Sequence, residues 1–351
     1  MVRNEKDEGI VTAYFVEKNT TGGVRFTRGS SSHGTERQDM ASFDATHSRV
    51  ELHADDYGIT LNQAHALLDI MQACREAGAS TGLSIFANSP CFEEAAAAAR
   101  GHLAFSPYAD ASLTRMRLHV NLVEGAPCAP AAEVPLLVNA RGTFEHDFIG
   151  LLRLSHSSEK GELKRQVTCE CSAQIARFLQ AFPEAKSSLQ LDSHQHVHAI
   201  PLICEALLDA ARACACKVTF LRSTIEPISP HRTAHTLRYA SPLNLGKVAL
   251  LNLLWRKSGQ LAHPECTTAM LCGVMLSGAM EHATPELAHA LEKYASSQAH
   301  TQPPRVEILF HPVSVPRANC LDPDNEPFAA ACASLSRDAE ARTIVRLAQS
   351  L

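Results

Sequence analysis

Short apolar runs that alternate with helical stretches constrain this chain more than any other feature. Each run has the length of a buried strand, and most are followed directly by polar or ionisable residues. Strands that alternate with helices favour an α/β protein built on a parallel sheet. The expected strands lie at residues 49–54, 82–86, 116–120, 188–192, 217–222 and 306–310.

The sequence predicts one large domain, residues 49–351, preceded by an N-terminal extension. Residues 1–48 are rich in Ser, Thr, Gly and charge, so we expect a poorly ordered, low-complexity segment with a short peripheral strand at 11–16. The segment 226–300 interrupts the alternation, and we expect it to form an insert or cap beside the site. The expected helices lie at 62–78, 92–100, 161–181, 243–255 and 328–350, with another that begins at Pro201.

Composition excludes several classes of protein. The formal net charge is −5 and aromatic residues make up 5% of the chain, so no basic surface interleaved with aromatics is expected for nucleic acid. No apolar run reaches the roughly 18 residues of a transmembrane segment, and no secretory signal is visible at the start. The twelve cysteines are scattered without redox or zinc-motif spacing, so they serve as small apolar residues. We therefore expect a soluble, cytoplasmic protein.

Ionisable or metal-coordinating side chains gather at four of the expected strand ends. Parallel barrels and open parallel sheets place their active sites at the carboxyl ends of strands. These side chains are therefore expected to meet at one mouth, and the histidine-rich run after the fourth strand is the most specific signal. The residues are Asp55 and Asp56, then His119, then Asp192 with His194, His196 and His198, and finally His311.

Imidazoles and carboxylates in this arrangement suit a divalent metal ion. Two imidazoles and one carboxylate favour Zn²⁺, Fe²⁺, Co²⁺ or Mn²⁺ over Mg²⁺ and leave positions open for water and substrate. A second carboxylate can take a proton from that water, and the adjacent Asp55 and Asp56 offer this division of roles. Simpler explanations stay open, with Asp56 as a helix cap and His119 as a satisfied semi-buried histidine. The histidines of the run cannot all be ligands, because the chain turns into a helix at Pro201.

Four motifs stand in order at these strand ends. They read Ala54-Asp-Asp-Tyr-Gly58, Leu118-His-Val-Asn-Leu-Val-Glu-Gly125, Leu191-Asp-Ser-His-Gln-His-Val-His198 and His311-Pro312. In combination they resemble the YdjC-like carbohydrate deacetylases, a family with chitooligosaccharide deacetylases and a branch associated with hopanoid biosynthesis. The segments 83–90 and 272–278 also resemble parts of that family, so the resemblance runs from Val50 to Pro312.

The resemblance implies a distorted (β/α) barrel, similar to a TIM barrel, and a role for each strand-end residue. Asp56, His119 and His194 would hold one divalent ion, which the family takes as Mg²⁺ or Zn²⁺. Asp55 would be the general base, and His311 the acid or the group that stabilises the tetrahedral intermediate. The residues expected to contact substrate or support the site are Asp192, His196, His198, Asn121 and Glu124, of which Glu124 is expected to orient His119.

The expected function is metal-dependent hydrolysis of an N-acetyl group on an amino sugar or oligosaccharide. The expected partner is the acetylated amino sugar, and a homodimer is left open. One alternative keeps the chemistry but acts on a lipid-linked or other non-chitin amide, with the apolar helix 243–255 near the substrate's tail. Another alternative is a non-catalytic carbohydrate- or metal-binding protein, against which Asp55 and His311 argue, because binding alone needs neither.

Overall fold

The computed structural model describes residues 49–102, 114–262, 266–298 and 305–351. The described residues belong to one compact unit, Thr46–Leu351. The expected extension, residues 1–48, and its expected strand at 11–16 lie outside the described residues. Within the described ranges, no helix combines the length and the apolar character that crossing a membrane requires.

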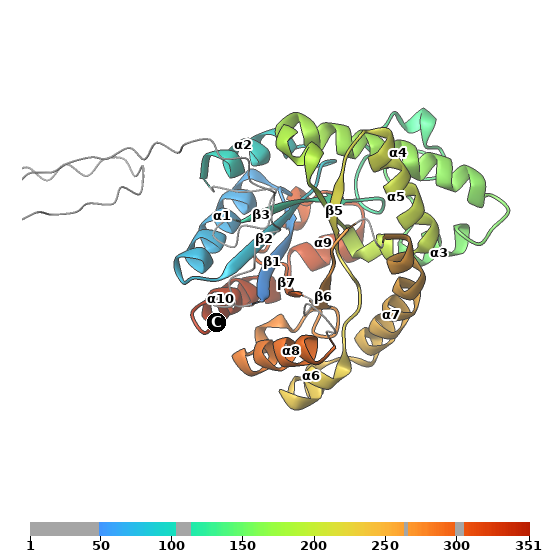
Figure 1. Ribbon diagram of the computed structural model, residues 1–351. Coiled ribbons are helices and arrows are strands. Elements are labelled where there is room, and N and C mark those ends of the chain that lie inside the picture. Colours follow the sequence, from blue (N-terminus) through green and yellow to red (C-terminus); the bar gives the residue numbers. More distant parts are fainter. Residues whose placement is uncertain (1–48, 103–113, 263–265, 299–304) are drawn as a thin grey trace, which may run out of the picture. The chain divides into compact units, whose positions relative to one another are not determined.

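Seven parallel strands form the sheet at the centre of this unit (Figure 1). Their spatial order is β5-β4-β3-β2-β1-β7-β6, and every pair of neighbours is parallel. All carboxyl ends therefore lie at the same end of the sheet. The strands are β1 Val50–Tyr57, β2 Ser80–Ile85, β3 Arg115–Val120, β4 Leu189–Ser193, β5 Val218–Leu221, β6 Ala269–Cys272 and β7 Arg305–Phe310.

The sheet curls until its two edge strands approach each other. Phe220 of β5 forms an isolated parallel bridge with Thr267, two residues before β6 begins. The backbone N–H of Leu221 donates to the Thr267 carbonyl at 3.1 Å, and that of Leu271 donates to Ile225 at 3.0 Å. The expected distorted (β/α) barrel is therefore confirmed, with an incomplete seam between β5 and β6 among the described residues.

Helices surround the curled sheet (Figure 1). Several begin at signals that are visible in the sequence: Thr60, Asp147, Thr284 and Asn325 each accept a hydrogen bond from a backbone N–H in the first turn. The helices are α1 Leu61–Glu76, α2 Phe92–His102, α3 Phe148–Leu154, α4 Lys160–Ala181, α5 Pro201–Ala213, α6 Ile228–Thr233, α7 Pro242–Ala262, α8 Pro285–Ser297, α9 Glu326–Cys332 and α10 Ser336–Ala348.

The strands bury both of their faces, but the two faces differ in chemistry. On β1, Val50, Leu52 and Ala54 belong to the main apolar core, whereas Glu51 and His53 are buried in polar contacts. Successive side chains of a strand point to opposite faces. The apolar face therefore packs against the surrounding helices, and the polar face lines the barrel interior.

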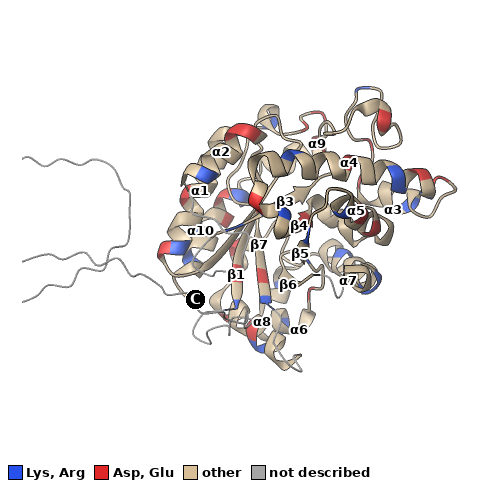
Figure 2. Ribbon diagram, turned by 45° about the horizontal axis from the view of Figure 1, so that its top comes forward, with Lys and Arg blue, Asp and Glu red and all other residues tan. Residues whose placement is uncertain are grey.

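The interior face carries a network of buried ion pairs, which we name the interior network: Glu51, His53, Asp55, Arg115, Arg117, Asp192, Arg222 and Glu307. Figure 2 shows charged residues of both signs on the central strands. Arg117 of β3 pairs with Glu51 of β1 and with Glu307 of β7. An unpaired buried charge costs several kcal/mol, so each charged side chain of the interior network depends on its partner of opposite charge.

Gly82 of β2 makes room for this network between β1 and β3. A Cβ at this position would overlap His53 Nδ1 and lie 2.6 Å from Glu51 Oε1. The absence of a side chain at Gly82 therefore lets Glu51 reach the arginines of β3.

Three expectations about local structure need correction. The segment 226–300 is not only an insert, because it contributes strand β6, which pairs with β7 through Ala269–Cys272. The single helix expected at 328–350 is two helices, α9 and α10, separated at Ala333–Leu335. Asp55 and Asp56 belong to β1 itself, which continues to Tyr57. In each instance the apolar pattern alone did not fix the type or the bounds of the element. They depend on hydrogen bonding to a distant strand or on a local turn.

We predict that Gly82→Ala destabilises the fold, because the new methyl group forces Glu51 and His53 away from their partners. Overpacking of this kind typically costs about 1–3 kcal/mol. Chemical denaturation followed by circular dichroism measures the free energy of unfolding. Gly101→Ala on α2, where an added Cβ meets nothing within 4 Å, is the matched control. An unchanged unfolding free energy for Gly82→Ala would show that the network has room to spare.

Candidate metal centre

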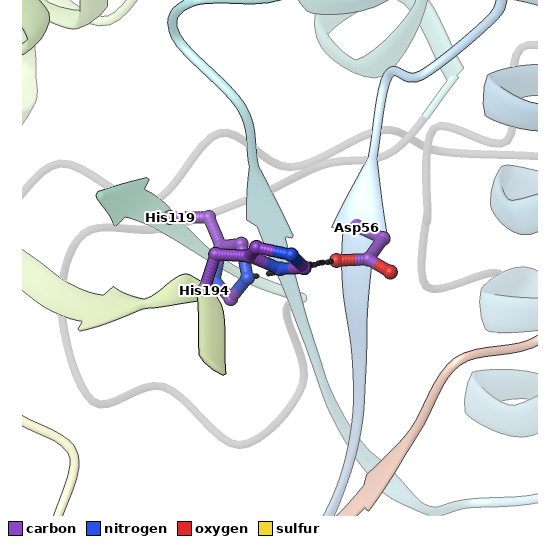
Figure 3. Close-up of side chains that lie close together, drawn as sticks. All are labelled: Asp56, His119 and His194. Carbon is purple, nitrogen blue, oxygen red and sulfur yellow. Dashed lines mark ion pairs between the residues drawn. The ribbon is translucent and has the colours of Figure 1, made fainter. Parts of the chain in front are cut away.

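Asp56, His119 and His194 converge at the carboxyl ends of three strands, and we name them the strand-end centre (Figure 3). Asp56 lies near the end of β1, His119 near the end of β3, and His194 directly after β4. Asp56 Oδ1 lies 3.2 Å from His194 Nδ1 and 3.7 Å from His119 Nε2. The structure therefore brings together the three residues that the resemblance assigned to one ion.

Backbone turns at the strand ends aim these side chains. Asp56 has a left-handed φ of 60°, which is uncommon for a residue other than glycine. The register between β1 and β2 shifts at this point, between Ala54 and Tyr57. Gln195 and His196 are also left-handed, with φ of 50° and 57°, in the tight turn that follows β4. Such local strain is typical of functional sites.

The donor atoms of the centre fit a cation. Among the described residues, Asp56 Oδ1 and His119 Nε2 are buried side-chain atoms without a hydrogen-bond partner. Unpaired buried polar atoms are costly, so two that face each other at 3.7 Å call for a group between them. One carboxylate oxygen and two imidazole nitrogens are a donor set that binds Zn²⁺ and related divalent ions.

A carboxylate orients His119 from behind. His119 Nδ1 lies 2.6 Å from Asp192 Oδ1, and Ser84 donates to the other oxygen of Asp192 at 2.5 Å. Burial alone would raise the pKa of Asp192, but Arg222 and His119 outweigh it and hold the pKa below its usual value. The ionised Asp192 keeps the proton of His119 on Nδ1, which leaves the Nε2 lone pair facing Asp56.

Glu124 lies beside His194, not beside His119 as the sequence suggested. Its Oε1 is 3.9 Å from His194 Nε2, and its other oxygen accepts from Asn325 Nδ2 at 2.7 Å. Burial raises the pKa of Glu124 to about 8. In each histidine of the centre, one ring nitrogen faces Asp56 and the other lies next to a second carboxylate. That carboxylate is Asp192 for His119 and Glu124 for His194.

Asp55, the expected base, is buried next to the centre in a bidentate pair with Arg222. Both of its oxygens lie 2.7 Å from Arg222 nitrogens, and Oδ2 lies 3.9 Å from His119 Nε2. Burial would raise the pKa of Asp55, but Arg222 and His119 outweigh it and hold the pKa well below its usual value. Asp55 is therefore a fixed carboxylate within reach of anything bound at the centre.

His311, the expected acid or oxyanion stabiliser, directly follows β7 and is partly exposed. Its backbone N–H donates to Glu340 Oε2 at 2.6 Å. Burial lowers the pKa of its imidazole to about 4, although Asp56 opposes the shift. The lowered pKa favours the neutral imidazole at neutral pH.

The remaining expected residues separate into two groups. His196 Nδ1 is buried without a hydrogen-bond partner in the described part of the chain, which suits a contact with a bound molecule. His198 is satisfied at both nitrogens, by Ser193 Oγ at 2.5 Å and by the Arg222 carbonyl at 2.9 Å. Asn121 accepts from the backbone N–H groups of Val123 and Glu124. His198 and Asn121 therefore shape the loops and offer no free group to a substrate.

Sequence reasoning missed two arginines that hold the carboxylates of the site. Arg222 follows β5, a strand-end position like those of the other site residues, and that position was the available signal. Arg337 lies on α10, far along the chain, and its Nη2 donates to Asp56 Oδ2 at 2.7 Å. Arg337 thus occupies one oxygen of Asp56 and leaves only Oδ1 for an ion. The helical pattern around Arg337 contains no signal of this role.

A family model for the YdjC-like proteins matches residues 49–345 of this chain. This chain belongs to the YdjC-like family. Its fold also resembles a crystal structure from Enterococcus faecalis V583, of a protein with a proposed role in cellobiose-phosphate cleavage. That likeness has a TM-score of 0.51 at 17% identity and covers 87% of this chain and 94% of the other.

Several curated proteins similar to this chain are named carbohydrate deacetylases. The Mus musculus and Homo sapiens proteins are each 29% identical to this chain over 175 residues, which is 49% of this chain. The Geobacillus stearothermophilus protein is 29% identical over 150 residues, which is 43% of this chain. The match spans about half the length of each relative, between 48% and 50%.

We predict that Asp192→Asn weakens metal binding, because the amide no longer holds the His119 proton on Nδ1. Loss of such a supporting carboxylate typically costs about 10–100-fold in metal affinity. Calorimetric titration of the metal-free protein with Zn²⁺ measures the dissociation constant, and the binding that Asp56→Ala loses identifies this centre. Asp209→Asn, at an acidic residue exposed on α5, is the control and should bind as the unaltered protein does. Equal affinities for the two variants would contradict the orienting role of Asp192.

Proposed function

We propose that this chain is a metal-dependent hydrolase that removes an N-acetyl group from an amino sugar or oligosaccharide. The strand-end centre carries the proposal: three convergent donors lie beside the carboxylate of Asp55, which Arg222 keeps charged. The name carbohydrate deacetylase of the curated relatives supports the substrate class.

A divalent ion in the centre would supply the Lewis acid that polarises the amide carbonyl and acidifies a water. Asp55 would accept the proton of that water as the general base and would return it to the amine nitrogen as the C–N bond breaks. Arg222 would hold both oxygens of Asp55 in place and keep it ionised between turnovers. The same bidentate pair lowers the basicity of Asp55. Asp55 can therefore accept a proton only from a water whose pKa the divalent ion has lowered.

His311 would stabilise the tetrahedral intermediate. Its pKa is lowered to about 4, which favours a neutral imidazole and disfavours a charged imidazolium acid. The neutral imidazole would donate a hydrogen bond to the developing oxyanion. His196, with an unpaired buried nitrogen, would contact the substrate. Glu124, with a pKa raised to about 8, would hold a proton at neutral pH until the site is occupied.

The metal is proposed to be Zn²⁺, with Mg²⁺ as the alternative. Two of the three donors are imidazole nitrogens, which Mg²⁺ rarely accepts in place of oxygen ligands. Arg337 restricts Asp56 to one donor oxygen, which lowers the oxygen count further. Activity of the metal-free protein after adding back each ion separately would decide between them.

Acetate release from a panel of acetylated glycans tests the function. The panel includes chitobiose, longer chitooligosaccharides and a lipid-linked N-acetyl sugar, each with and without chelator. Release that disappears with chelator and returns with a divalent ion supports the proposal. Binding of the glycans without acetate release would favour the non-catalytic alternative. A preference for the lipid-linked sugar would favour the alternative in which the enzyme deacetylates a lipid-linked substrate. Helix α7 could contact the lipid tail of such a substrate, because Leu243 and Leu253 on this helix are 69% and 61% exposed.

We predict that Asp55→Asn lowers kcat by about 10²–10⁴-fold, the usual contribution of a general base. The amide cannot accept the proton, but its shape and site are kept, so bound metal should remain near the level of the unaltered protein. Steady-state acetate release and metal analysis measure the two quantities. Asp69→Asn, at an acidic residue on the exposed face of α1, is the control. Retained turnover by Asp55→Asn would remove Asp55 as the base.

We predict that His311→Gln lowers kcat by about 10²–10³-fold, as does removal of an oxyanion donor. KM should change little, because the donor is needed mainly in the transition state. Kinetics over a range of substrate concentrations separates the two parameters. His156→Gln, at an exposed histidine after α3, should leave both unchanged. A variant whose KM alone rises would make His311 a substrate-binding residue instead.

A further inference from the structure

A second group of metal-ligating side chains lies away from the strand-end centre. Glu226 follows β5, His231 lies on α6, and Cys272 is the last residue of β6. All three are fully buried, and one donor atom from each lies within 4.8 Å of the other two. We name this group the seam cluster, because its residues stand on both sides of the seam between β5 and β6.

The distances in the seam cluster match the ligand spacing of a tetrahedral zinc site. His231 Nε2 lies 3.2 Å from Glu226 Oε1 and 3.8 Å from Cys272 Sγ. Zinc–ligand bonds at tetrahedral angles give separations of about 3.4 Å between nitrogen and oxygen and about 3.6 Å between nitrogen and sulfur. The two distances to His231 are thus close to those between ligands of one zinc ion, and all three donors lie within 4.8 Å of one another.

The side chains of the seam cluster share one histidine nitrogen. Glu226 and Cys272 both face the same nitrogen of His231, and one ring nitrogen carries at most one proton. The other nitrogen, Nδ1, lies 3.1 Å from Thr236 Oγ1, whose hydroxyl faces the His231 carbonyl at 3.4 Å. This arrangement directs the Nδ1 proton to Thr236 and leaves the Nε2 lone pair to the cluster, as in histidines that bind metals.

The charge of the seam cluster also calls for a cation. Glu226 accepts from the backbone N–H groups of Gly273 and Met275, both at 2.9 Å. Among the described residues no lysine or arginine forms an ion pair with it, and the basic side chain beside it is the His231 imidazole, with Nε2 at 3.2 Å. The buried carboxylates of the interior network, by comparison, form ion pairs with Arg117 and Arg222. The seam cluster, in contrast, contains no such arginine.

We propose that Glu226, His231 and Cys272 bind a second divalent ion, of the zinc class, which fastens the seam of the barrel. The Cys272 thiol would release its proton to solvent on binding, because thiolate is the ligand form. The ion would join the segment after β5, helix α6 and strand β6 beside the backbone hydrogen bond that Leu271 donates to Ile225. A surface cavity of about 330 Å³ is lined in part by Thr236, the residue that contacts His231 Nδ1.

Metal stoichiometry tests this proposal on the full chain. Each protein is stripped with chelator, loaded with Zn²⁺, desalted and analysed for bound zinc. We expect two equivalents for the unaltered protein, one for Asp56→Ala, one for Cys272→Ala, and none for the double variant. Cys171→Ala, at another fully buried cysteine on α4, is the matched control and should keep two.

A spectroscopic measurement avoids dependence on the folding of Cys272→Ala. Asp56→Ala loaded with Co²⁺ should show the near-ultraviolet thiolate-to-cobalt charge-transfer band, because the strand-end centre contains no sulfur. Absence of that band, or an Asp56→Ala protein that holds no zinc, would overturn the proposal. A different result would be one zinc in the unaltered protein, one in Asp56→Ala and none in Cys272→Ala. That result would support the seam site and contradict the proposed metal-dependent function.

Discussion

The Arg222 guanidinium is the group on which the rest of the structure depends. It stands at the end of β5 and pairs with Asp55 of β1, Asp192 of β4 and Glu307 of β7. Two of these strands are not neighbours of β5 in the sheet, so the pairs span the barrel interior. Each of these buried charges would be costly alone, and a flat sheet could not bring them together. The interior network thus favours the curled sheet over an open one.

The same guanidinium connects the interior network to the strand-end centre. One oxygen of Asp192 contacts Arg222 and the other contacts His119. The Arg222 guanidinium in the barrel interior therefore fixes Asp192, and Asp192 in turn orients the His119 ring at the strand ends. Asp55 is held by both of its oxygens and stays charged in a fully buried position. Arg337 acts in a similar way on Asp56, to which it donates a hydrogen bond. The geometry of the centre is therefore set by charges that are themselves locked by the fold.

Much of this site could be predicted from the strand-end positions. Asp56, His119 and His194 follow or end apolar runs, and in a parallel sheet such positions meet at one edge. Glu124 was assigned to the wrong histidine, because the loop after β3 carries it across to His194. Arg337 carried no signal, since a helical arginine is usually exposed. The strand β6 was missed because it is short and lies within a long helical region.

The sequence by itself determined the parallel α/β class, the strands that supply the donors and the likeness to the YdjC-like family. These follow from local periodicity and from motifs whose members lie close together in the chain. Only the tertiary structure decided which carboxylate serves which histidine, that arginines hold both aspartates, and that Glu226, His231 and Cys272 meet at the seam. Those contacts join distant segments, and their partners are chosen by how the sheet curls and where the helices pack around it.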